Sequence, residues 1–200
     1  MAKHQILLTG TGGQGLILAA IMLAEAAVAA GKNVLQTQSF GPEARGGASK
    51  AEVIISDSKI YYPKVMTPDL VLTMSSEAFR KYGVGLKSES LLLIDTTFVQ
   101  EDIIRPHNRI ALPITRLTRK EFGSDQSANV VALGIIAALT NLLPKKNLKE
   151  AVLNRSPKGS GQRNLSALEL GWMLGLAELD SNNLLGCQDF NNDSWACPAL

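Results

Sequence analysis

Residues 5–31 read QILLTGTGGQGLILAAIMLAEAAVAAG and decide the fold of this chain. An Ile- and Leu-rich run comes first, a glycine-rich turn follows at residues 10–15, and a long Ala- and Leu-rich segment ends at Gly31. A strand, a glycine-rich turn and a helix in this order form the first half of a β-α-β unit. Glu25 is the only charged residue of the helix expected over residues 13–30, so we expect this helix to be buried on both sides, by its own fold or by a partner chain.

The glycine-rich turn is the first candidate binding site. Gly10, Gly12 and Gly15 have the G-x-G-x-x-G spacing, in which the glycines allow a tight turn, close approach of a phosphate and packing of helix on strand. The helix N-terminus adds unpaired N–H groups and a partial positive charge. We therefore expect a phosphate-bearing ligand to face the turn, although a strand–helix turn that binds nothing has the same spacing. The candidate residues are Gly10, Thr11, Gly12, Gly13, Gln14 and Gly15.

The sequence after the expected second strand disfavours a nicotinamide cofactor. A dinucleotide-binding fold places Asp or Glu about 20 residues beyond the glycines to hold a ribose hydroxyl. Residues 36–39 here are Gln-Thr-Gln-Ser, without an acid or an arginine. An NAD(P)-dependent oxidoreductase stays open as an alternative that depends on the glycines alone.

A second glycine-rich loop follows at residues 39–47, which read SFGPEARGG. Its proline and glycines exclude a helix and permit close approach to another surface. Arg45 is able to pair with a carboxylate or a phosphate, whereas a solvated loop would leave only a weak Glu43–Arg45 pair. We favour the functional interpretation, with Ser39, Gly41, Glu43, Arg45 and Gly46 as candidate site residues.

The remaining sequence predicts a Rossmann-like α/β fold. Strands are expected at residues 33–38, 51–56, 70–74, 91–94 and 109–114, with a short helix at 76–82. Helices are expected at 127–143, at 148–154 and along an apolar stripe from Leu165 to Leu179. This order predicts a three-layer sandwich with a mainly parallel sheet. We expect one domain over residues 1–180 and a tail over 181–200 without periodicity.

Hydroxyl residues follow two of the expected strands. Ligands of open α/β sheets bind beyond the carboxyl ends of the strands, so Ser75 and Thr96 are expected to point toward the glycine-rich turn. Structural roles are equally good explanations for the residues at these strand ends, with Ser76 as the cap of the following helix and Asp95 holding a turn. Asn129 is expected either to cap its helix or to hydrogen-bond across an interface.

Composition narrows the functional class. The chain has 200 residues, 46% hydrophobic and 19% charged, with a formal net charge of +2, which argues for a globular protein and against a nucleic-acid partner. No run reaches the length of a membrane span, and the N-terminus leads directly into a strand, so we expect a cytoplasmic protein. Cys187 and Cys197 form no C-x-x-C pair, and the only histidines, His4 and His107, indicate no catalytic triad.

Four segments together resemble one known family. They are GTGGQG at 10–15, SFGPEARGG at 39–47, VIISD at 53–57 and PDLVLTMS at 68–75. In order and spacing they are similar to the gamma subunit of 2-oxoacid:ferredoxin (acceptor) oxidoreductases, which act on pyruvate, 2-oxoglutarate and related substrates. The resemblance extends over about residues 5–179, and overall likeness favours 2-oxoglutarate.

This resemblance implies a subunit of a larger enzyme. Enzymes of this family decarboxylate a 2-oxoacid on thiamine diphosphate with magnesium, pass electrons through iron–sulfur clusters to ferredoxin and form an acyl-coenzyme A. Those cofactors are expected on alpha, beta and ferredoxin-like partner subunits, while the glycine-rich turn and the 41–47 loop are expected to face coenzyme A or a partner. The isolated chain is then expected to be inactive. A non-enzymatic homodimer, with apolar helix faces buried between copies, stays open as an alternative.

Overall fold

The computed structural model describes residues 2–39, 48–100 and 108–181 as an α/β domain. In chain order the elements are β1 (Lys3–Thr11), α1 (Leu16–Ala29), β2 (Asn33–Ser39), β3 (Ala48–Ser56), β4 (Leu70–Thr73), α2 (Ser76–Tyr82), β5 (Leu91–Asp95), β6 (Arg109–Leu112), α3 (Ile114–Phe122), α4 (Ala128–Thr140), α5 (Lys145–Arg155) and α6 (Gly161–Ser181).

The six strands form one mixed sheet in the order β2-β3-β1-β4-β5-β6. From β1 to β6 the neighbouring strands are parallel, whereas β3 is antiparallel to both β1 and β2. Every residue of β4 and β5 is buried, as expected for parallel strands that are covered on both faces. The expected mainly parallel sheet is confirmed, and an antiparallel hairpin of β2 and β3 extends it on one side.

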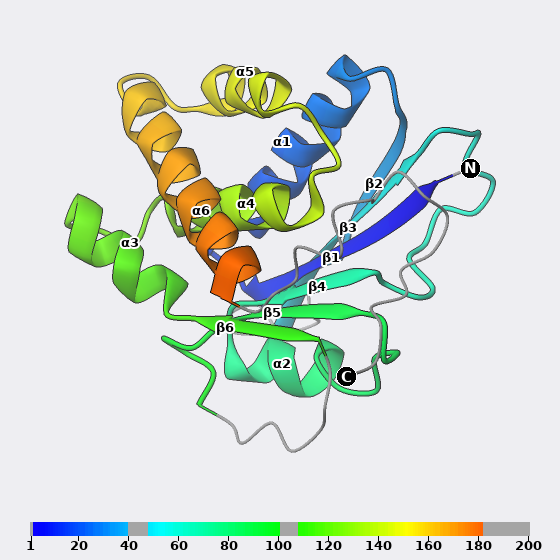
Figure 1. The fold of residues 1–200 in the computed structure, drawn as a ribbon, viewed down its shortest axis with the longest axis horizontal. Helices are drawn as coiled ribbons and strands as arrows, with labels where there is room; N and C mark the ends of the chain where they lie inside the picture. The colour runs from blue at the N-terminus through cyan, green and yellow to red at the C-terminus, as the bar shows by residue number, and fades with distance from the viewer. Residues whose placement is uncertain (1, 40–47, 101–107, 182–200) are drawn as a thin grey trace.

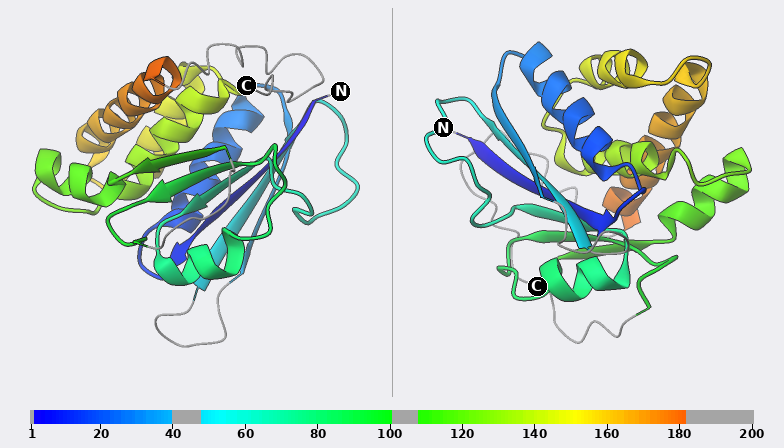
Figure 2. Two further views of the ribbon diagram at one scale, coloured as in Figure 1. Left: turned by 60° about the horizontal axis from the view of Figure 1, so that its bottom comes forward. Right: turned by 180° about the vertical axis from the view of Figure 1, so that it is seen from behind.

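Helices cover the two faces of the sheet unequally. The helices α1, α4, α5 and α6 gather on one face, and α2 lies on the other (Figures 1 and 2). The larger core includes Ile6, Leu8 and Leu72 of the sheet together with most of α1 and α4. The smaller core centres on Val71, Leu92 and other residues that face α2. This arrangement gives the three expected layers.

The apolar helix α1 is buried by its own chain. Its buried residues recur along the helix from Leu16 to Ala27, and the first residue with an exposed side chain is Val28. The sheet covers one side of α1, while α5 and α4 cover the other, as the contacts between these elements show. The ion pair between Glu25 and Arg155 joins α1 to α5 at the surface. Of the two explanations for the apolar sequence, burial within the fold is confirmed.

Glycines bring α4 and α6 into close contact. A Cβ atom on Gly171 would lie 2.0 Å from the Val131 carbonyl oxygen, and one on Gly134 would lie 2.3 Å from the Leu168 carbonyl oxygen. Gly175 continues the contact beside Ala138. With α6 on one side and the rest of the core on the other, all thirteen residues of α4 are buried.

The structure corrects the sequence prediction at one connection. The strand expected over residues 109–114 ends at Leu112, and Pro113 is the N-cap of the helix α3, which was not expected from the sequence. Pro113 has the fixed φ that suits a helix start, Arg119 and Lys120 lie in the last turn, and Gly123 closes the helix at a φ of 72°. Those start and stop signals were present in the sequence. The other expected elements are confirmed with shifted ends.

The described residues contain no helix with the length and apolar composition needed to cross a membrane. Most of the expected tail, residues 182–200, lies outside the described residues, as do Cys187 and Cys197.

The α4–α6 contact predicts an unusual response to Gly171→Ala. Alanine normally stabilises a helix relative to glycine, but a Cβ atom here would meet backbone. We expect Gly171→Ala to lower the free energy of unfolding by about 1–3 kcal/mol, as overpacking does. Urea unfolding followed by circular dichroism measures the change. Gly161→Ala, also in α6, is the matched control, because its Cβ would meet only the flexible end of Leu153 at 3.3 Å. Equal stability of the two variants would contradict the close contact.

Candidate functional site

The carboxyl ends of β1, β4 and β5 lie side by side at one edge of the sheet. The chain leaves β1 for α1 on one face and leaves β4 for α2 on the opposite face (Figures 1 and 2). A pair of neighbouring strands whose helices go to opposite faces is a topological switch point, where open α/β sheets bind ligands. The glycine-rich turn after β1 and Ser75 after β4 both lie at this point, as the sequence predicts.

Two glycines of the turn have backbone conformations that other residues rarely adopt. Gly13 has a φ of 92° and Gly15 a φ of 72°, both in the left-handed region. Gly10 is needed for space, because a Cβ atom there would lie 2.2 Å from Oε1 of Gln14. The tight-turn role predicted for the glycines is therefore visible in the geometry.

The Gln14 side chain connects the turn to β4. Its Oε1 accepts the Thr11 N–H at 2.8 Å, and its Nε2 donates to the Met74 carbonyl oxygen at 2.8 Å. One side chain thus fills the inside of the turn and spans the switch point between β1 and β4. Gln14 was expected in the site from the sequence, but this internal role has no sign in the sequence.

Asn129 supports the turn from the helical layer. Its Nδ2 donates to the Gly15 carbonyl oxygen at 3.0 Å, and a Cβ atom on Gly15 would lie 2.7 Å from that nitrogen. Asn129 is 4% exposed, and its Oδ1 has no hydrogen-bond partner. The capping role is wrong, because the N-cap of α4 is Ser127, and the Asn129 amide donates to the N-cap residue of α1 instead.

The described residues leave the outer side of the turn open. Gly12 and Gly13 are exposed, and a Cβ atom on either would meet nothing within 4 Å. The N-cap of α1 is Gly15, which provides no side-chain cap, and the first turn of α1 contains no acidic residue. Backbone N–H groups and the positive end of α1 are thus available to an anion. The Thr11 N–H is an exception, because it already donates to Gln14 Oε1.

The strands β2 and β3 bring Ser39 and Ala48, the described residues on either side of residues 40–47, to the same edge. Thr11 pairs with Ala48, Ser39 pairs with Lys50, and the Ser49 hydroxyl donates to the Gly10 carbonyl oxygen at 3.2 Å. Ser39 and Ala48, which flank the loop, therefore lie close to the glycine-rich turn. The candidate residues Gly41, Glu43, Arg45 and Gly46 lie outside the described residues.

The sheet order disfavours a nicotinamide cofactor for a second reason. In a dinucleotide-binding fold, the strand that supplies the ribose-binding acid lies beside β1. Here β3 occupies that position and runs antiparallel to β1, so the end of β2 is one strand farther away. The lack of an acid at residues 36–39 and the position of β3 between β1 and β2 both argue against a nicotinamide cofactor.

The hydroxyl and acidic residues after β4 and β5 have structural roles. Ser75 is the N-cap of α2 and accepts the Ala78 N–H at 3.2 Å. Asp95 is fully buried, and its carboxylate accepts the Thr97 N–H and the Thr115 N–H and hydroxyl. The turn predicted at Asp95 is confirmed, whereas the helix cap is Ser75, one residue before the predicted cap Ser76, which is the first residue of α2. The backbone N–H of Thr96 donates to the Leu112 carbonyl oxygen, which places Thr96 at the edge beside Ser75.

A polar cluster on the hairpin was not anticipated from the sequence. Glu52 is 7% exposed and lies on the sheet face toward α2, where it accepts the Thr37 hydroxyl at 2.8 Å and pairs with Lys50 at 2.9 Å. The Lys50 Nζ lies 6.0 Å from the centre of the Tyr82 ring of α2. The alternation of β3 predicts which residues share this face, but nothing local in the sequence predicts these partners.

Two groups whose pKa values are shifted by burial, Asp69 and His4, lie at the opposite edge of the sheet. Burial raises the pKa of Asp69, which precedes β4, although the Gln5 N–H bonded to it acts in the other direction. Burial likewise lowers the pKa of His4 near the start of β1. In the described ranges, no group of three or more His, Cys, Asp or Glu residues could hold a metal ion. The chemistry that the described turn offers is backbone recognition of an anion.

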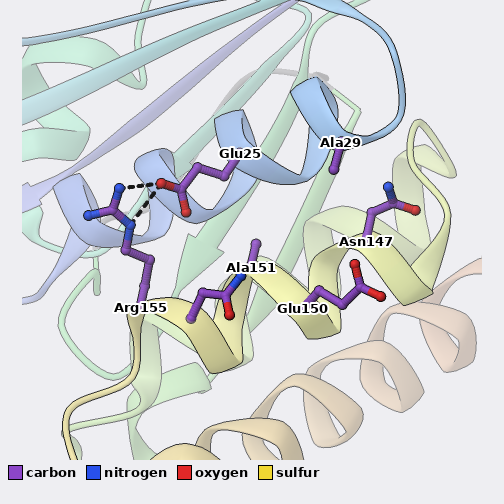
Figure 3. Close-up of a pocket in the computed structure, with 7 residues that line it drawn as sticks. Glu25, Ala29, Asn147, Glu150, Ala151 and Arg155 are labelled. Carbon is purple, nitrogen blue, oxygen red and sulfur yellow. Dashed lines mark hydrogen bonds and ion pairs between the residues drawn. The ribbon is translucent and has the colours of Figure 1, made fainter.

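A surface pocket of about 390 Å³ lies elsewhere, between α1 and α5 (Figure 3). Arg155 donates to Glu25 across one end of it, and the Arg155 Nε–Glu25 Oε1 distance is 2.8 Å. The pairing raises the pKa of Arg155. The pocket is formed from the later turns of α1 and includes no residue of the glycine-rich turn. We assign it no role in the candidate site.

Comparisons with known proteins agree on one family. The family model described as pyruvate ferredoxin/flavodoxin oxidoreductase matches residues 5–173. The 2-oxoglutarate synthase subunit KorC of Methanocaldococcus jannaschii is 41% identical over 85% of this chain and 92% of its own length.

Two solved structures have a similar fold. The gamma subunit of a keto/oxoacid ferredoxin oxidoreductase from Geobacter sulfurreducens is 40% identical, with a TM-score of 0.78 over 87% of this chain and 99% of that one. The 2-oxoglutarate:ferredoxin oxidoreductase of Magnetococcus marinus, solved with 2-oxoglutarate, coenzyme A and succinyl-CoA bound, is 28% identical. Its TM-score is also 0.78, over 88% of this chain and 32% of the longer Magnetococcus chain.

The Gln14 bridge predicts a loss of stability in Gln14→Ala. The substitution removes the partner of the Thr11 N–H and of the Met74 carbonyl oxygen, so we expect the free energy of unfolding to fall by about 1–3 kcal/mol. Urea unfolding measures it. Gln162→Ala is the control, since Gln162 is an exposed glutamine of α6 and its change should be close to zero. If Gln14→Ala is as stable as the control, the bridge does not hold the turn.

Proposed function

This chain belongs to the pyruvate ferredoxin/flavodoxin oxidoreductase family, and we propose that it is the gamma subunit of a 2-oxoglutarate:ferredoxin oxidoreductase. The observation that carries the proposal is the 41% identity to a 2-oxoglutarate synthase subunit over 92% of that subunit's length. The complex would convert 2-oxoglutarate and coenzyme A to succinyl-CoA and carbon dioxide, and would pass two electrons to ferredoxin.

The proposed complex divides the chemistry among its chains. Thiamine diphosphate with magnesium and the iron–sulfur clusters would be held by alpha, beta and ferredoxin-like subunits, with ferredoxin as the electron acceptor. The present chain would contribute a rigid ligand-binding edge, and alone it would be inactive. Ferredoxin-linked metabolism of this kind supports a cytoplasmic location.

We further propose that the glycine-rich turn binds a phosphate of coenzyme A. Three features support this role: the open space over Gly12 and Gly13, the uncapped start of α1, and the position at the switch point between β1 and β4. When bound, coenzyme A supplies the thiol that accepts the acyl group. The chain would hold the nucleotide end and thereby orient the thiol toward a partner subunit.

The other candidate residues would complete this site. Support comes from Ser39, the last residue of β2, and from Ala48, the first residue of β3, which pairs with Thr11 of the turn. Arg45 would pair with a second phosphate, while Gly41 and Gly46 would allow close approach and Glu43 would orient Arg45. Ser75 and Thr96 would offer polar contacts at the neighbouring strand ends.

The substrate assignment predicts the activity of the assembled enzyme. We expect a complex isolated through a tag on this chain to contain thiamine-binding and ferredoxin-like subunits. Its kcat/KM for 2-oxoglutarate should exceed that for pyruvate, in an assay of ferredoxin reduction that depends on coenzyme A. Higher activity with pyruvate would overturn the choice of substrate. Isolation of this chain alone, with saturable NADH binding, would overturn the proposed function itself.

The phosphate assignment predicts a charge effect at Gly12. A side chain fits there without contact, so Gly12→Asp and Gly12→Asn should both fold and assemble. The two differ in charge, and only the carboxylate would repel a phosphate at the start of α1. We expect KM for coenzyme A to be about tenfold higher in Gly12→Asp than in Gly12→Asn, equivalent to about 1.4 kcal/mol, with KM for 2-oxoglutarate unchanged. Equal KM values for coenzyme A would contradict phosphate binding at this turn and would not affect the family assignment.

A further inference from the structure

The outer face of α6 is apolar where a solvated helix is normally polar. Met173 and Leu176 are 66% and 44% exposed, and the exposed Ala177 lies next to Leu176. The opposite face of α6 packs on α4 through Gly171 and Gly175. We refer to Met173, Leu176 and Ala177 as the α6 stripe. Among the described residues, the packing of α6 thus leaves this apolar stripe facing outward.

Opposite charges lie at the two ends of the stripe. Before it, Glu169 pairs with Lys145 at 2.5 Å and with Lys149 at 2.7 Å, so two lysines share one carboxylate and leave an excess of positive charge. After it, Asp180 is exposed, and α6 ends one residue later at Ser181. The carbonyl end of a helix carries a partial negative charge, which adds to the charge of Asp180.

These features are arranged symmetrically along α6. Met173 and Leu176 are equally far from the point between residues 174 and 175, and so are Glu169 and Asp180. At about 3.6 residues per turn, these four side chains share one face of the helix. If two copies pair antiparallel about a two-fold axis at this point, Met173 of each lies against Leu176 of the other. The same register brings Asp180 of each copy to the level of Glu169, and so to the lysine pair, of the other.

We propose that two copies of this chain associate through α6, in an antiparallel pairing centred on the α6 stripe. The apolar side chains would form the middle of the contact. At each end, Lys145 and Lys149 of one copy would flank Asp180 of the other. The pairing does not depend on the proposed function; in a 2-oxoacid oxidoreductase it would join two copies of the complex through their gamma subunits.

The apolar and the charged parts of the contact have different effects. The stripe supplies the buried apolar area that drives association. The charges select the antiparallel direction, because a parallel pair would place Asp180 against Asp180 and lysine against lysine. Stable protein interfaces bury about 1,600 Å² in total, and one helix pair with a three-residue apolar centre buries less. We therefore expect reversible association with a dissociation constant in the micromolar range.

Sedimentation equilibrium of the full-length chain tests the pairing. We expect a monomer–dimer equilibrium over the micromolar range of protein concentration. Leu176→Asp places a carboxylate at the centre of the stripe, so this variant should remain monomeric at the same concentrations. Leu153→Asp is the matched control, because Leu153 is 46% exposed on α5 and lies outside the stripe. The control should dimerise as the unmodified chain does.

Asp180→Lys tests the antiparallel register. The substitution replaces attraction by repulsion at both ends of the two-fold contact, so we expect the dissociation constant to rise about tenfold. A lysine in the last turn of a helix favours the helix, so the fold of the monomer should not be weakened. Added salt should weaken the dimer of the unmodified chain, because it screens the attraction, but should not weaken the Asp180→Lys dimer further.

Several results would overturn the proposal. A chain that stays monomeric would do so, as would a dimer that survives Leu176→Asp or is weakened equally by Leu153→Asp. An unchanged dissociation constant in Asp180→Lys would exclude the antiparallel register. A monomeric chain whose Met173 is protected from peroxide oxidation only in the assembled complex would assign the stripe to a different subunit, which also overturns the proposal.

Discussion

The Gln14 side chain is the contact on which the candidate site depends. It accepts the Thr11 N–H and donates to the Met74 carbonyl oxygen, so that the turn after β1 is fixed to the end of β4. Asn129 holds the same turn from the helical layer through the Gly15 carbonyl oxygen. A glycine-rich turn without these contacts would lose conformational entropy on binding a ligand. Here the bonds from Gln14 and Asn129 hold the turn in one conformation before any ligand binds.

This internal support determines which part of the turn is open to another molecule. Gln14 occupies the inner side and leaves no N–H of Thr11 for a ligand, while Gly12 and Gly13 face outward without neighbours. The antiparallel strand β3 separates β1 from β2 and brings the hairpin, rather than an acidic strand end, to the turn. The glycine spacing is that of dinucleotide-binding proteins, but here the turn lies beside an antiparallel hairpin and has no acidic strand end next to it. Those surroundings agree with a subunit that positions a ligand for chemistry on another chain.

The sequence predicts the frame of the molecule better than its contacts. Apolar runs of the right length predict β1, β4 and β5, because strands covered on both faces need continuous hydrophobic sequence. The glycine spacing and the strand ends also predict where the candidate site lies. The antiparallel β3 was beyond prediction, since a short apolar strand carries no local sign of its direction or neighbours. For the same reason the bonds from Gln14 to Met74 and from Asn129 to Gly15, which join residues 60 and 114 positions apart, are visible only in the folded chain. The helix α3 is different, because Pro113 and Gly123 marked its ends in the sequence.

We propose that the glycine-rich turn contacts coenzyme A within an assembled 2-oxoacid oxidoreductase. Hydrogen exchange of the complex, measured by mass spectrometry with and without saturating coenzyme A, tests it most directly. We expect slower exchange of the backbone amides in residues 12–18 when coenzyme A is present, because the N–H groups at the start of α1 would be bound to phosphate. Unchanged exchange in residues 12–18, with protection confined to other subunits, would contradict it.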